Sequence, residues 1–191
     1  NLRKQILDAP HIRRRSGHPF FLYLHYTLVH PEYAVPSLGL YADKPWTEEE
    51  KIFAAMVGMI DHDMGRIFAL LRELGIDANT IVFFCSDNGG WKRHEGRFDS
   101  NRGLRGAFGD VYEGGLRIPM IVRWPGKTPA GARSDRPWTF ADVLPTLAEM
   151  AGGALLPGID GVSVLPGIQG KRQELERMLY WEQYSPNGFE Q

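Results

Sequence analysis

The chain has 191 residues, of which 43% are hydrophobic and 24% charged, an ordinary composition that is long enough for one globular domain with a core. Its formal net charge of −1 gives no electrostatic basis for binding nucleic acid or an anionic membrane. No apolar stretch approaches the about 20 residues that span a bilayer. These properties exclude the nucleic-acid-binding and membrane-spanning classes and predict a globular protein.

The first elements in chain order are a linker, a strand and a loop. Residues 1–15 are typical of the end of a helix followed by a linker. Residues 20–26 are aromatic and β-prone, which predicts a buried strand. Pro31 ends that run, and residues 31–46 contain prolines and few periodic apolar positions, so they are predicted to form a loop.

A long helix is predicted next. Thr47 and Glu50 have the spacing of a capping box, and Gly75 is a suitable C-terminal cap. Between them, apolar residues recur at spacings of three and four, which indicates one apolar stripe along a helix. The stripe consists of Phe53, Met56, Val57, Ile60, Met64, Ile67, Leu71 and Leu74.

Residues 80–85 form an almost wholly apolar run and predict a buried parallel strand. Asp87 and Asn88 follow it directly and supply hard oxygen atoms, which suit Ca²⁺ or Mg²⁺ better than zinc. Taken alone, Ser86-Asp87-Asn88-Gly89 also fits a simple turn after a strand. Cys85, the single cysteine, lies within the apolar run and is predicted to be inert core.

The remaining chain alternates loops with short elements. Residues 87–116 are glycine-rich and charged, and loops of this length in compact domains are usually functional or disordered. Residues 117–124 predict a strand, and Thr139-Phe140-Ala141-Asp142 is a second capping box that opens a helix through Met150. Residues 152–170 read as a connection, and residues 178–184 predict a final strand.

Five segments in this order resemble the signature segments of the sulfatase family, which belongs to the alkaline-phosphatase superfamily. They are residues 19–30, which end in His30; residues 56–66; residues 80–89; residues 112–119, continued by 123–126; and residues 142–147. The resemblance covers roughly residues 18 to 184. It implies an α/β fold with an alkaline-phosphatase-like mixed sheet sandwiched by helices. The fold is expected to be incomplete: residues 1–170 would be the C-terminal portion of the catalytic domain, and 171–191 the start of a small antiparallel C-terminal subdomain.

The resemblance implies an enzyme that hydrolyses sulfate esters, using a formylglycine nucleophile and a divalent cation, usually Ca²⁺, with Mg²⁺ as the alternative. By position, Asp87 and Asn88 are the expected metal ligands and His30 the catalytic histidine that contacts the sulfate. The substrate would be a sulfated small molecule or glycan. The compartment is not given by the residues, and the resemblance points to a periplasmic, secreted or lysosomal protein rather than a cytoplasmic one.

The chain departs from the family pattern in two ways. The segments with the acidic pair and the Cys/Ser-x-Pro-x-Arg motif are missing, and Cys85 cannot replace that motif because no Pro-x-Arg follows it. Phe108 stands where the family carries a lysine that touches the sulfate. Arg105, His94 or Lys92 could take over that contact, with a surface role as the alternative for each; His94 and Arg105 are the predicted substrate-binding residues.

The Tyr112–Pro119 segment allows two interpretations. Gly114 and Gly115 are expected to let the backbone pass close to the site loop. Glu113 and Arg117 could bind substrate, but a structural ion pair is favoured because a glutamate would repel a sulfate.

Two other functions stay open. A phosphodiesterase or phosphonate hydrolase of the same superfamily would share the metal site and this part of the sequence. A non-catalytic, sulfatase-like binding module is suggested by Phe108 in place of the lysine.

Overall fold

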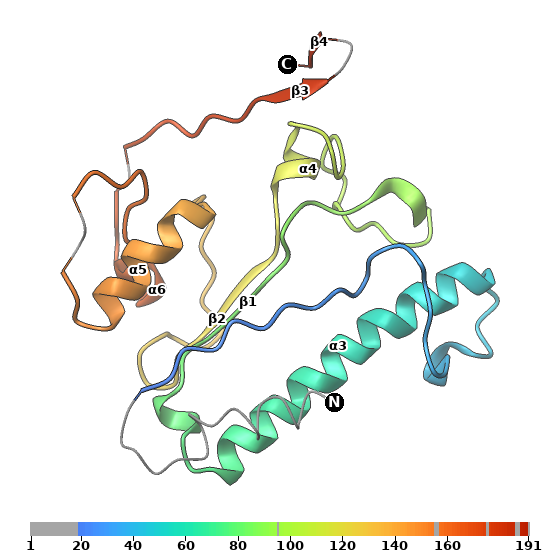
Figure 1. Ribbon diagram of the computed structural model, residues 1–191, viewed down its shortest axis with the longest axis horizontal. Coiled ribbons are helices and arrows are strands. Elements are labelled where there is room, and N and C mark those ends of the chain that lie inside the picture. The colour runs from blue at the N-terminus through green and yellow to red at the C-terminus, as the bar shows by residue number, and fades with distance from the viewer. Residues whose placement is uncertain (1–18, 95, 155–156, 175, 186–187, 191) are drawn as a thin grey trace. The chain divides into compact units, whose positions relative to one another are not determined.

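The computed structural model of the protein describes residues 19–190 except 95, 155–156, 175 and 186–187, and the chain divides into two compact units, Asn1–Asp77 and Ala78–Gln191 (Figure 1). The predicted helix end and linker at residues 1–15 lie outside the described residues. In the first unit the elements are a 3₁₀ helix, Gly39–Tyr41, and α3, Glu48–Glu73. No helix within the described residues is long and apolar enough to cross a membrane.

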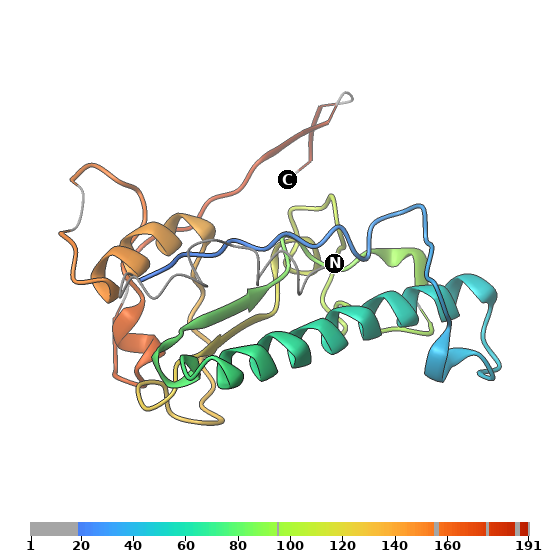
Figure 2. The same ribbon diagram turned by 60° about the horizontal axis from the view of Figure 1, so that its bottom comes forward.

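Helix α3 begins and ends where the sequence predicts (Figure 2). The Glu50 N–H donates to Thr47 Oγ1 at 3.3 Å and the Thr47 N–H donates to Glu50 Oε2 at 2.8 Å, which completes the predicted capping box. At the other end Gly75 has φ 69°, and the N–H groups of Gly75 and Ile76 donate to the carbonyls of Arg72 and Leu71. This pair of bonds is a Schellman motif, which satisfies carbonyls that the helix itself leaves unpaired.

The apolar face of α3 is only partly the predicted one. Its buried residues are Ala54, Ala55, Met56, Leu70 and Leu71, whereas Val57 is 46% exposed and Leu74 38% exposed. In the ribbon views, the chain that begins at residue 19 runs beside α3 in the opposite direction (Figures 1 and 2). The Tyr33 and Phe53 ring centroids lie 5.9 Å apart, and burial together with the charge of Asp63 raises the pKa of Tyr26.

The predicted strand at residues 20–26 is wrong. The segment is extended, but it pairs with no strand among the described residues, and Phe21 and Tyr23 are 76% and 73% exposed. A β-prone sequence becomes a strand only where a neighbouring chain accepts and donates its backbone hydrogen bonds.

The second unit contains two short antiparallel strand pairs, β1–β2 and β3–β4. The 3₁₀ helix η2, Asp77–Asn79, begins at the last residue of the first unit. The further elements of the second unit are β1 Val82–Cys85, η3 Lys92–His94, α4 Glu113–Leu116, β2 Met120–Arg123, η4 Phe140–Asp142, α5 Val143–Met150, α6 Leu165–Ile168, β3 Gln183–Ser185 and β4 Gly188–Glu190. The glycine-rich segment 87–116 is largely loop, as predicted, and the strand predicted at 117–124 is β2, in a shorter form.

Strand β1 differs from its prediction in pairing and burial. It lies beside β2 with Val82 opposite Arg123 and Cys85 opposite Met120, so the observed pair is antiparallel rather than parallel (Figure 2). Cys85 is exposed, which corrects its predicted place in the core. The apolar run predicts a strand covered on both faces, but within the described chain β1 has one neighbour and its side chains are half-buried or exposed.

Helix α5 is the second element that local signals predict correctly. The Thr139 N–H donates to Asp142 Oδ2 at 2.7 Å, which completes the second capping box. At the C-terminal end Gly152 has φ 73°, and the N–H groups of Gly152 and Gly153 donate to the carbonyls of Glu149 and Ala148 in another Schellman motif.

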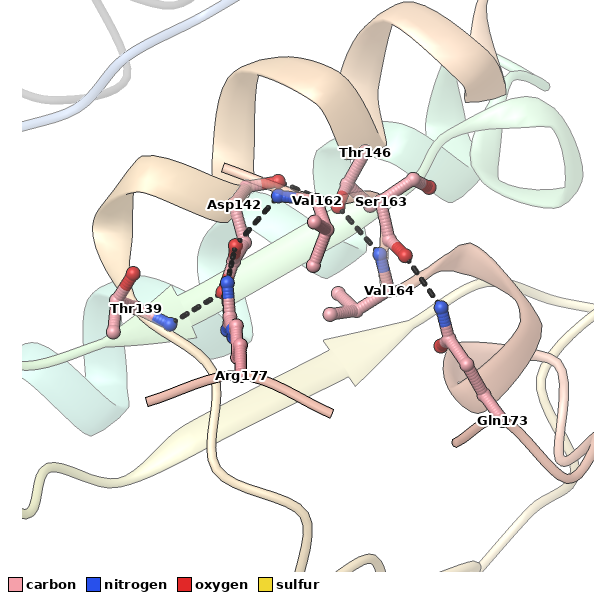
Figure 3. Close-up of polar contacts among 8 residues, drawn as sticks. All are labelled: Thr139, Asp142, Thr146, Val162, Ser163, Val164, Gln173 and Arg177. Atoms are coloured by element: carbon pink, nitrogen blue, oxygen red, sulfur yellow. Dashed lines mark hydrogen bonds and ion pairs between the residues drawn. The ribbon is translucent and has the colours of Figure 1, made fainter. Parts of the chain in front are cut away.

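Asp142 also binds Val162 and Arg177, two later residues, at the start of α5 (Figure 3). Its side chain is fully buried and accepts the Val162 N–H at 2.9 Å, and both Arg177 Nη atoms lie 2.5 Å from its carboxylate oxygens. One turn along the helix, the buried Thr146 hydroxyl donates to the Asp142 carbonyl and accepts the Val164 N–H. Residues 162–164 and 177 are therefore held by the same end of one helix.

The Asp142–Arg177 pair is a buried, two-pronged ion pair. Burial alone would raise the pKa of the Asp142 carboxyl, but the hydrogen bonds from Arg177 and from the backbone of Thr139 and Val162 bring that pKa below its ordinary value of 3.8. A carboxyl with a lowered pKa in the folded state stabilises the fold above its ordinary pKa. That contribution is lost as the pH falls below about 3.8.

The strand predicted at residues 178–184 starts later than expected. Only Gln183–Ser185 pairs, with Gly188–Glu190, while Met178 is 91% exposed and Tyr180 75% exposed. The segment 178–182 has no backbone partner among the described residues, which is why its β-prone sequence forms no ladder. The predicted division at residue 170 stays a prediction.

Replacing Arg177 tests the role of the ion pair. Arg177→Ala leaves the buried Asp142 carboxylate without its cation, and we expect a loss of roughly 3–5 kcal/mol in unfolding free energy. The matched control is Arg172→Ala, because Arg172 pairs with Glu174 at an exposed site, and its loss is expected to be below about 1 kcal/mol. Urea unfolding of the full-length polypeptide that contains these residues measures both. Equal losses in the two variants would contradict the assigned role.

Candidate functional site

The predicted ligand pair lies directly after the end of β1, as the sequence indicates. Asp87 is exposed, and none of the hydrogen bonds or ion pairs of the described residues involves its carboxylate. The Asn88 Nδ2 group donates to the Gly89 carbonyl at 2.8 Å, and the Ser86 hydroxyl donates to the Asn88 carbonyl at 3.1 Å. These bonds orient the Asn88 amide and leave its Oδ1 atom, together with the Asp87 carboxylate, available for a ligand.

Residues 86–90, called the ligand loop below, make backbone hydrogen bonds to two other segments. The Gly89 N–H donates to the Gly115 carbonyl at 2.9 Å, which ties the loop to α4. The Phe108 N–H donates to the Gly90 carbonyl at 3.0 Å, and the Gly114 N–H donates to the Arg105 carbonyl at 2.7 Å. The ligand loop, α4 and the segment 105–108 therefore form one hydrogen-bonded layer.

Glycines allow these segments to touch through their backbones. A Cβ atom at Gly89 would lie 1.9 Å from the Gly114 carbonyl oxygen, and one at Gly115 would lie 2.1 Å from the Asp110 carbonyl oxygen. Gly114 is equally restricted, since its Cβ would lie 2.1 Å from the Gly106 carbonyl oxygen. The prediction that Gly114 and Gly115 let the backbone pass close to the site loop is confirmed.

Asn101 is part of this layer, and the sequence did not indicate it. Its Oδ1 atom accepts the Gly90 N–H at 2.7 Å, and its Nδ2 group donates to the Gly90 and Gly106 carbonyls at 3.1 Å each. No spacing rule connects an asparagine in a loop with a glycine eleven residues earlier, so only the folded structure reveals the contact.

The other loop residues considered for substrate binding lie in the second unit, each in its own contact. Arg105 Cζ lies 3.7 Å from the centroid of the Tyr112 ring, and its Nη2 donates to the Tyr112 hydroxyl at 2.7 Å. Lys92 Nζ lies 3.8 Å from Asp110 Oδ2, which makes it part of an ion pair. His94 is half-buried, with its ring centroid 6.1 Å from that of Phe98. Binding of substrate by Arg105 and His94 stays a prediction.

Glu113 and Arg117 form the predicted structural ion pair, with Arg117 Nε 2.6 Å from Glu113 Oε2. His30 is exposed and belongs to the first unit, whereas the other predicted site residues belong to the second. Its catalytic role stays a prediction.

The donor chemistry at Asp87 and Asn88 fits part of a site for a hard divalent cation. A carboxylate and an amide oxygen are the ligand types that Ca²⁺ and Mg²⁺ prefer, and Ca²⁺ takes about six to eight of them. No group of three or more His, Cys, Asp or Glu side chains with the geometry of a metal site occurs in the described part of the chain. A complete coordination sphere would need ligands beyond this pair.

Cys85 lies next to the pair but has the wrong properties for a nucleophile. Partial desolvation of the Cys85 thiol and the negative charge of Asp87 raise its pKa above the ordinary value of 9.0. The thiol is therefore protonated at neutral pH, and only the thiolate is reactive.

The sulfatase family model matches residues 1–154 of the chain. Mouse steryl-sulfatase is 37% identical over 180 residues, which are 86% of this chain and 27% of the mouse protein. Pig N-acetylgalactosamine-6-sulfatase is 36% identical over 186 residues, which are 93% of this chain and 34% of that protein. The chain therefore belongs to the sulfatase family, as its motifs indicate, and spans about a third or less of the length of these relatives.

Solved structures support the same fold. The crystal structure of Ps i-CgsB in complex with k-i-k-neocarrahexaose has a TM-score of 0.75 and 30% identity, covering 85% of this chain and 36% of its own. A protein in complex with its substrate D-glucosamine-2-N,6-O-disulfate has a TM-score of 0.59 and 26% identity, and the match covers 71% of this chain and 26% of that protein. A phosphonate monoester hydrolase from Silicibacter pomeroyi, with a TM-score of 0.52 and 23% identity, shares the fold. The predicted alkaline-phosphatase-like α/β class is confirmed.

Substitution of Gly89 tests whether close backbone contact holds the ligand loop. Gly89→Ala places a Cβ against the Gly114 carbonyl, and we expect a loss of roughly 1–3 kcal/mol in unfolding free energy because neither backbone can yield freely. The matched control is Gly65→Ala in α3, where a Cβ meets nothing within 4 Å. There alanine should stabilise the protein by roughly 0.5–1 kcal/mol, since glycine is a poor helix former. A harmless Gly89→Ala substitution would contradict the close contact.

Proposed function

We propose that the polypeptide containing these residues hydrolyses sulfate esters and that this chain supplies part of its metal and substrate site. The observation that carries the proposal is the Asp87–Asn88 pair, which follows β1 in a loop tied to α4 by the Gly89–Gly115 hydrogen bond. Membership of the sulfatase family supports the same activity.

In this proposal, the Asp87 carboxylate and the Asn88 Oδ1 atom hold a divalent cation, with Ca²⁺ preferred and Mg²⁺ as the alternative. Such a cation, when bound, supplies positive charge next to the sulfate oxygens, where negative charge develops during hydrolysis. The Asn88 Nδ2–Gly89 hydrogen bond fixes the orientation of the amide, and Oδ1 is not the atom that it uses. His30 is proposed to contact the sulfate.

The nucleophile is proposed to be a formylglycine outside these 191 residues. Cys85 is followed by Ser86, Asp87 and Asn88 rather than by Pro-x-Arg, and its thiol pKa is raised. These two properties argue against Cys85 in that role.

The proposed substrate is a sulfated small molecule or glycan. The protein is proposed to be periplasmic, secreted or lysosomal rather than cytoplasmic. Two structures with the same fold were solved with a neocarrahexaose and with a glucosamine disulfate, which supports the glycan class. Arg105 and His94 are the proposed substrate contacts. The Tyr112 ring and hydroxyl hold the Arg105 guanidinium in one orientation, so it would meet an anion without first losing side-chain freedom.

Neutralising Asp87 tests the proposed activity. Asp87→Asn keeps the size of the side chain but removes the charge, and we expect kcat/KM for an aryl sulfate to fall by about 10–100-fold. Asp135→Asn is the control, because Asp135 is also exposed and lies in the second unit, and it should leave kcat/KM unchanged. Rates are measured with the full-length polypeptide at several calcium concentrations. Wild-type activity in Asp87→Asn would contradict the proposal. If the wild-type protein clearly preferred an aryl phosphodiester to the aryl sulfate, the activity would be assigned to the phosphodiesterase class instead.

A second candidate, a non-catalytic module that binds sulfated glycans, is supported by Phe108. Its ring is 56% exposed on a segment whose backbone bonds to Gly90, so an apolar side chain stands beside the ligand loop. If the site is catalytic but weakened, Phe108→Lys should raise turnover several-fold, because a lysine adds a cation and donors for the sulfate.

The control for this substitution is Leu104→Lys, which adds the same charge at a side chain 42% exposed in the same loop and should not change turnover. Turnover of an aryl sulfate and binding of a sulfated glycan are measured for both variants and the wild type. Retained glycan binding with no turnover in any of the three would establish the module and contradict the enzyme.

A further inference from the structure

The side chain of Asn101, a half-buried loop residue, makes three hydrogen bonds to backbone groups. Its carboxamide pairs with both backbone groups of one residue: Oδ1 accepts the Gly90 N–H at 2.7 Å and Nδ2 donates to the Gly90 carbonyl at 3.1 Å. A neighbouring β-strand would use the same pattern, in which one peptide unit donates to and accepts from its partner. The second Nδ2 hydrogen donates to the Gly106 carbonyl at 3.1 Å, so the amide bridges two segments.

The site is shaped to accept this carboxamide. A Cβ atom at Gly90 would lie 2.7 Å from Asn101 Oδ1 and 2.6 Å from the Ser100 Cβ, so only glycine leaves room for the pairing. Gly106, the other partner, has φ 83°, a backbone conformation that favours glycine, and this turn directs its carbonyl to the amide.

Gly90 is two residues after Asn88, so its position limits where the ligand pair can lie. Between them, the Gly89 N–H is fixed by the Gly115 carbonyl and the Gly89 carbonyl accepts the Asn88 side chain. The Gly90 carbonyl receives a further bond from the Phe108 N–H at 3.0 Å. If the Asn101 bonds are removed, Gly90 keeps one of its three bonds, the one from the Phe108 N–H, and the Gly89–Gly115 bond to α4 remains beside it.

We infer that Asn101 is a positioning residue for the divalent-cation site, which it serves by fixing the Gly90 peptide groups behind the Asp87–Asn88 pair. This inference rests on the proposed function. Asn101 touches neither the cation nor the substrate; it sets the orientation in which Asp87 and Asn88 present their oxygens. Its loss therefore weakens metal binding more than it weakens the fold.

Two substitutions separate the parts of this contact. Asn101→Asp keeps an acceptor for the Gly90 N–H but turns carboxylate oxygens toward the Gly90 and Gly106 carbonyls, whereas Asn101→Ala removes all three bonds. Ser100→Ala is the matched control, since Ser100 is the exposed neighbour and alanine keeps its Cβ.

The experiment titrates the metal-free full-length polypeptide with CaCl₂ alone and records the rise in melting temperature. Because stabilisation by a ligand grows with the logarithm of its concentration above Kd and does not saturate, the variants are compared at the calcium concentration that gives one fixed rise, here called the half-point. The half-point should increase by about 10–100-fold in both Asn101 variants, as is typical when a supporting residue behind a metal ligand is lost. It should stay at the wild-type value in Ser100→Ala. An unchanged half-point in the Asn101 variants, together with a lower melting temperature without calcium, would show a purely structural role and overturn the inference.

The wild type separates this inference from the proposed function. A wild-type protein that shows no calcium-induced rise has no such site, and both statements fail. A wild type that responds, with Asn101 variants of equal half-point, overturns the inference alone. Hydrogen exchange of the wild type adds a test without any variant: the Gly90 amide should exchange at least tenfold more slowly than an open loop amide, and unprotected exchange there would also overturn the inference.

Discussion

The contact between Gly89 and α4 determines how the candidate site is built. The Gly89 N–H donates to the Gly115 carbonyl, and the two chains are so close that a methyl group on Gly89 would lie 1.9 Å from the Gly114 oxygen. A single neutral hydrogen bond adds only about 0.5–1.5 kcal/mol to stability. Its importance here is geometric, because it fixes the loop with Asp87 and Asn88 relative to a helix whose own glycines are buried.

The same arrangement requires glycine at its points of contact. Three segments meet through their backbones, and side chains at Gly89, Gly114 or Gly115 would force them apart. Asn101 joins two of them by pairing with both backbone groups of Gly90 and donating to the Gly106 carbonyl. The buried ion pair of Asp142 and Arg177 fastens a separate part of the second unit and does not depend on this layer.

Local signals predicted helices α3 and α5 well, missed the short helices α4 and α6, and predicted the strands poorly. Helices α3 and α5 start and end at caps whose partners lie within a few residues, so the Thr47–Glu50 box and the glycine after each helix are visible in the sequence. Strands need distant partners. Residues 20–26 and 178–182 are β-prone but have no ladder in the described chain, and β1 is antiparallel to β2 rather than parallel.

The contacts of the site also differ in how far they could be predicted. Asp87 and Asn88 were singled out because their side-chain oxygens directly follow an apolar run and lie in a segment that resembles the family's; their role as ligands stays a prediction. The Glu113–Arg117 ion pair was also predicted, on the ground that a glutamate would repel a sulfate, and the structure contains it. Asn101 and the Asp142–Arg177 pair were not, since their partners lie 11 and 35 residues away and no periodicity connects them. Phe108 was recognised only as a departure from a family pattern.

The central claim is that Asp87 and Asn88 are held in place to bind a divalent cation. A crystal structure of the full-length polypeptide grown with calcium tests it most directly. Our account predicts an ion about 2.3–2.6 Å from an Asp87 carboxylate oxygen and from Asn88 Oδ1. It also predicts that the Gly89–Gly115 and Gly90–Asn101 hydrogen bonds are intact. A calcium ion bound elsewhere, with neither side chain among its ligands, would contradict the account.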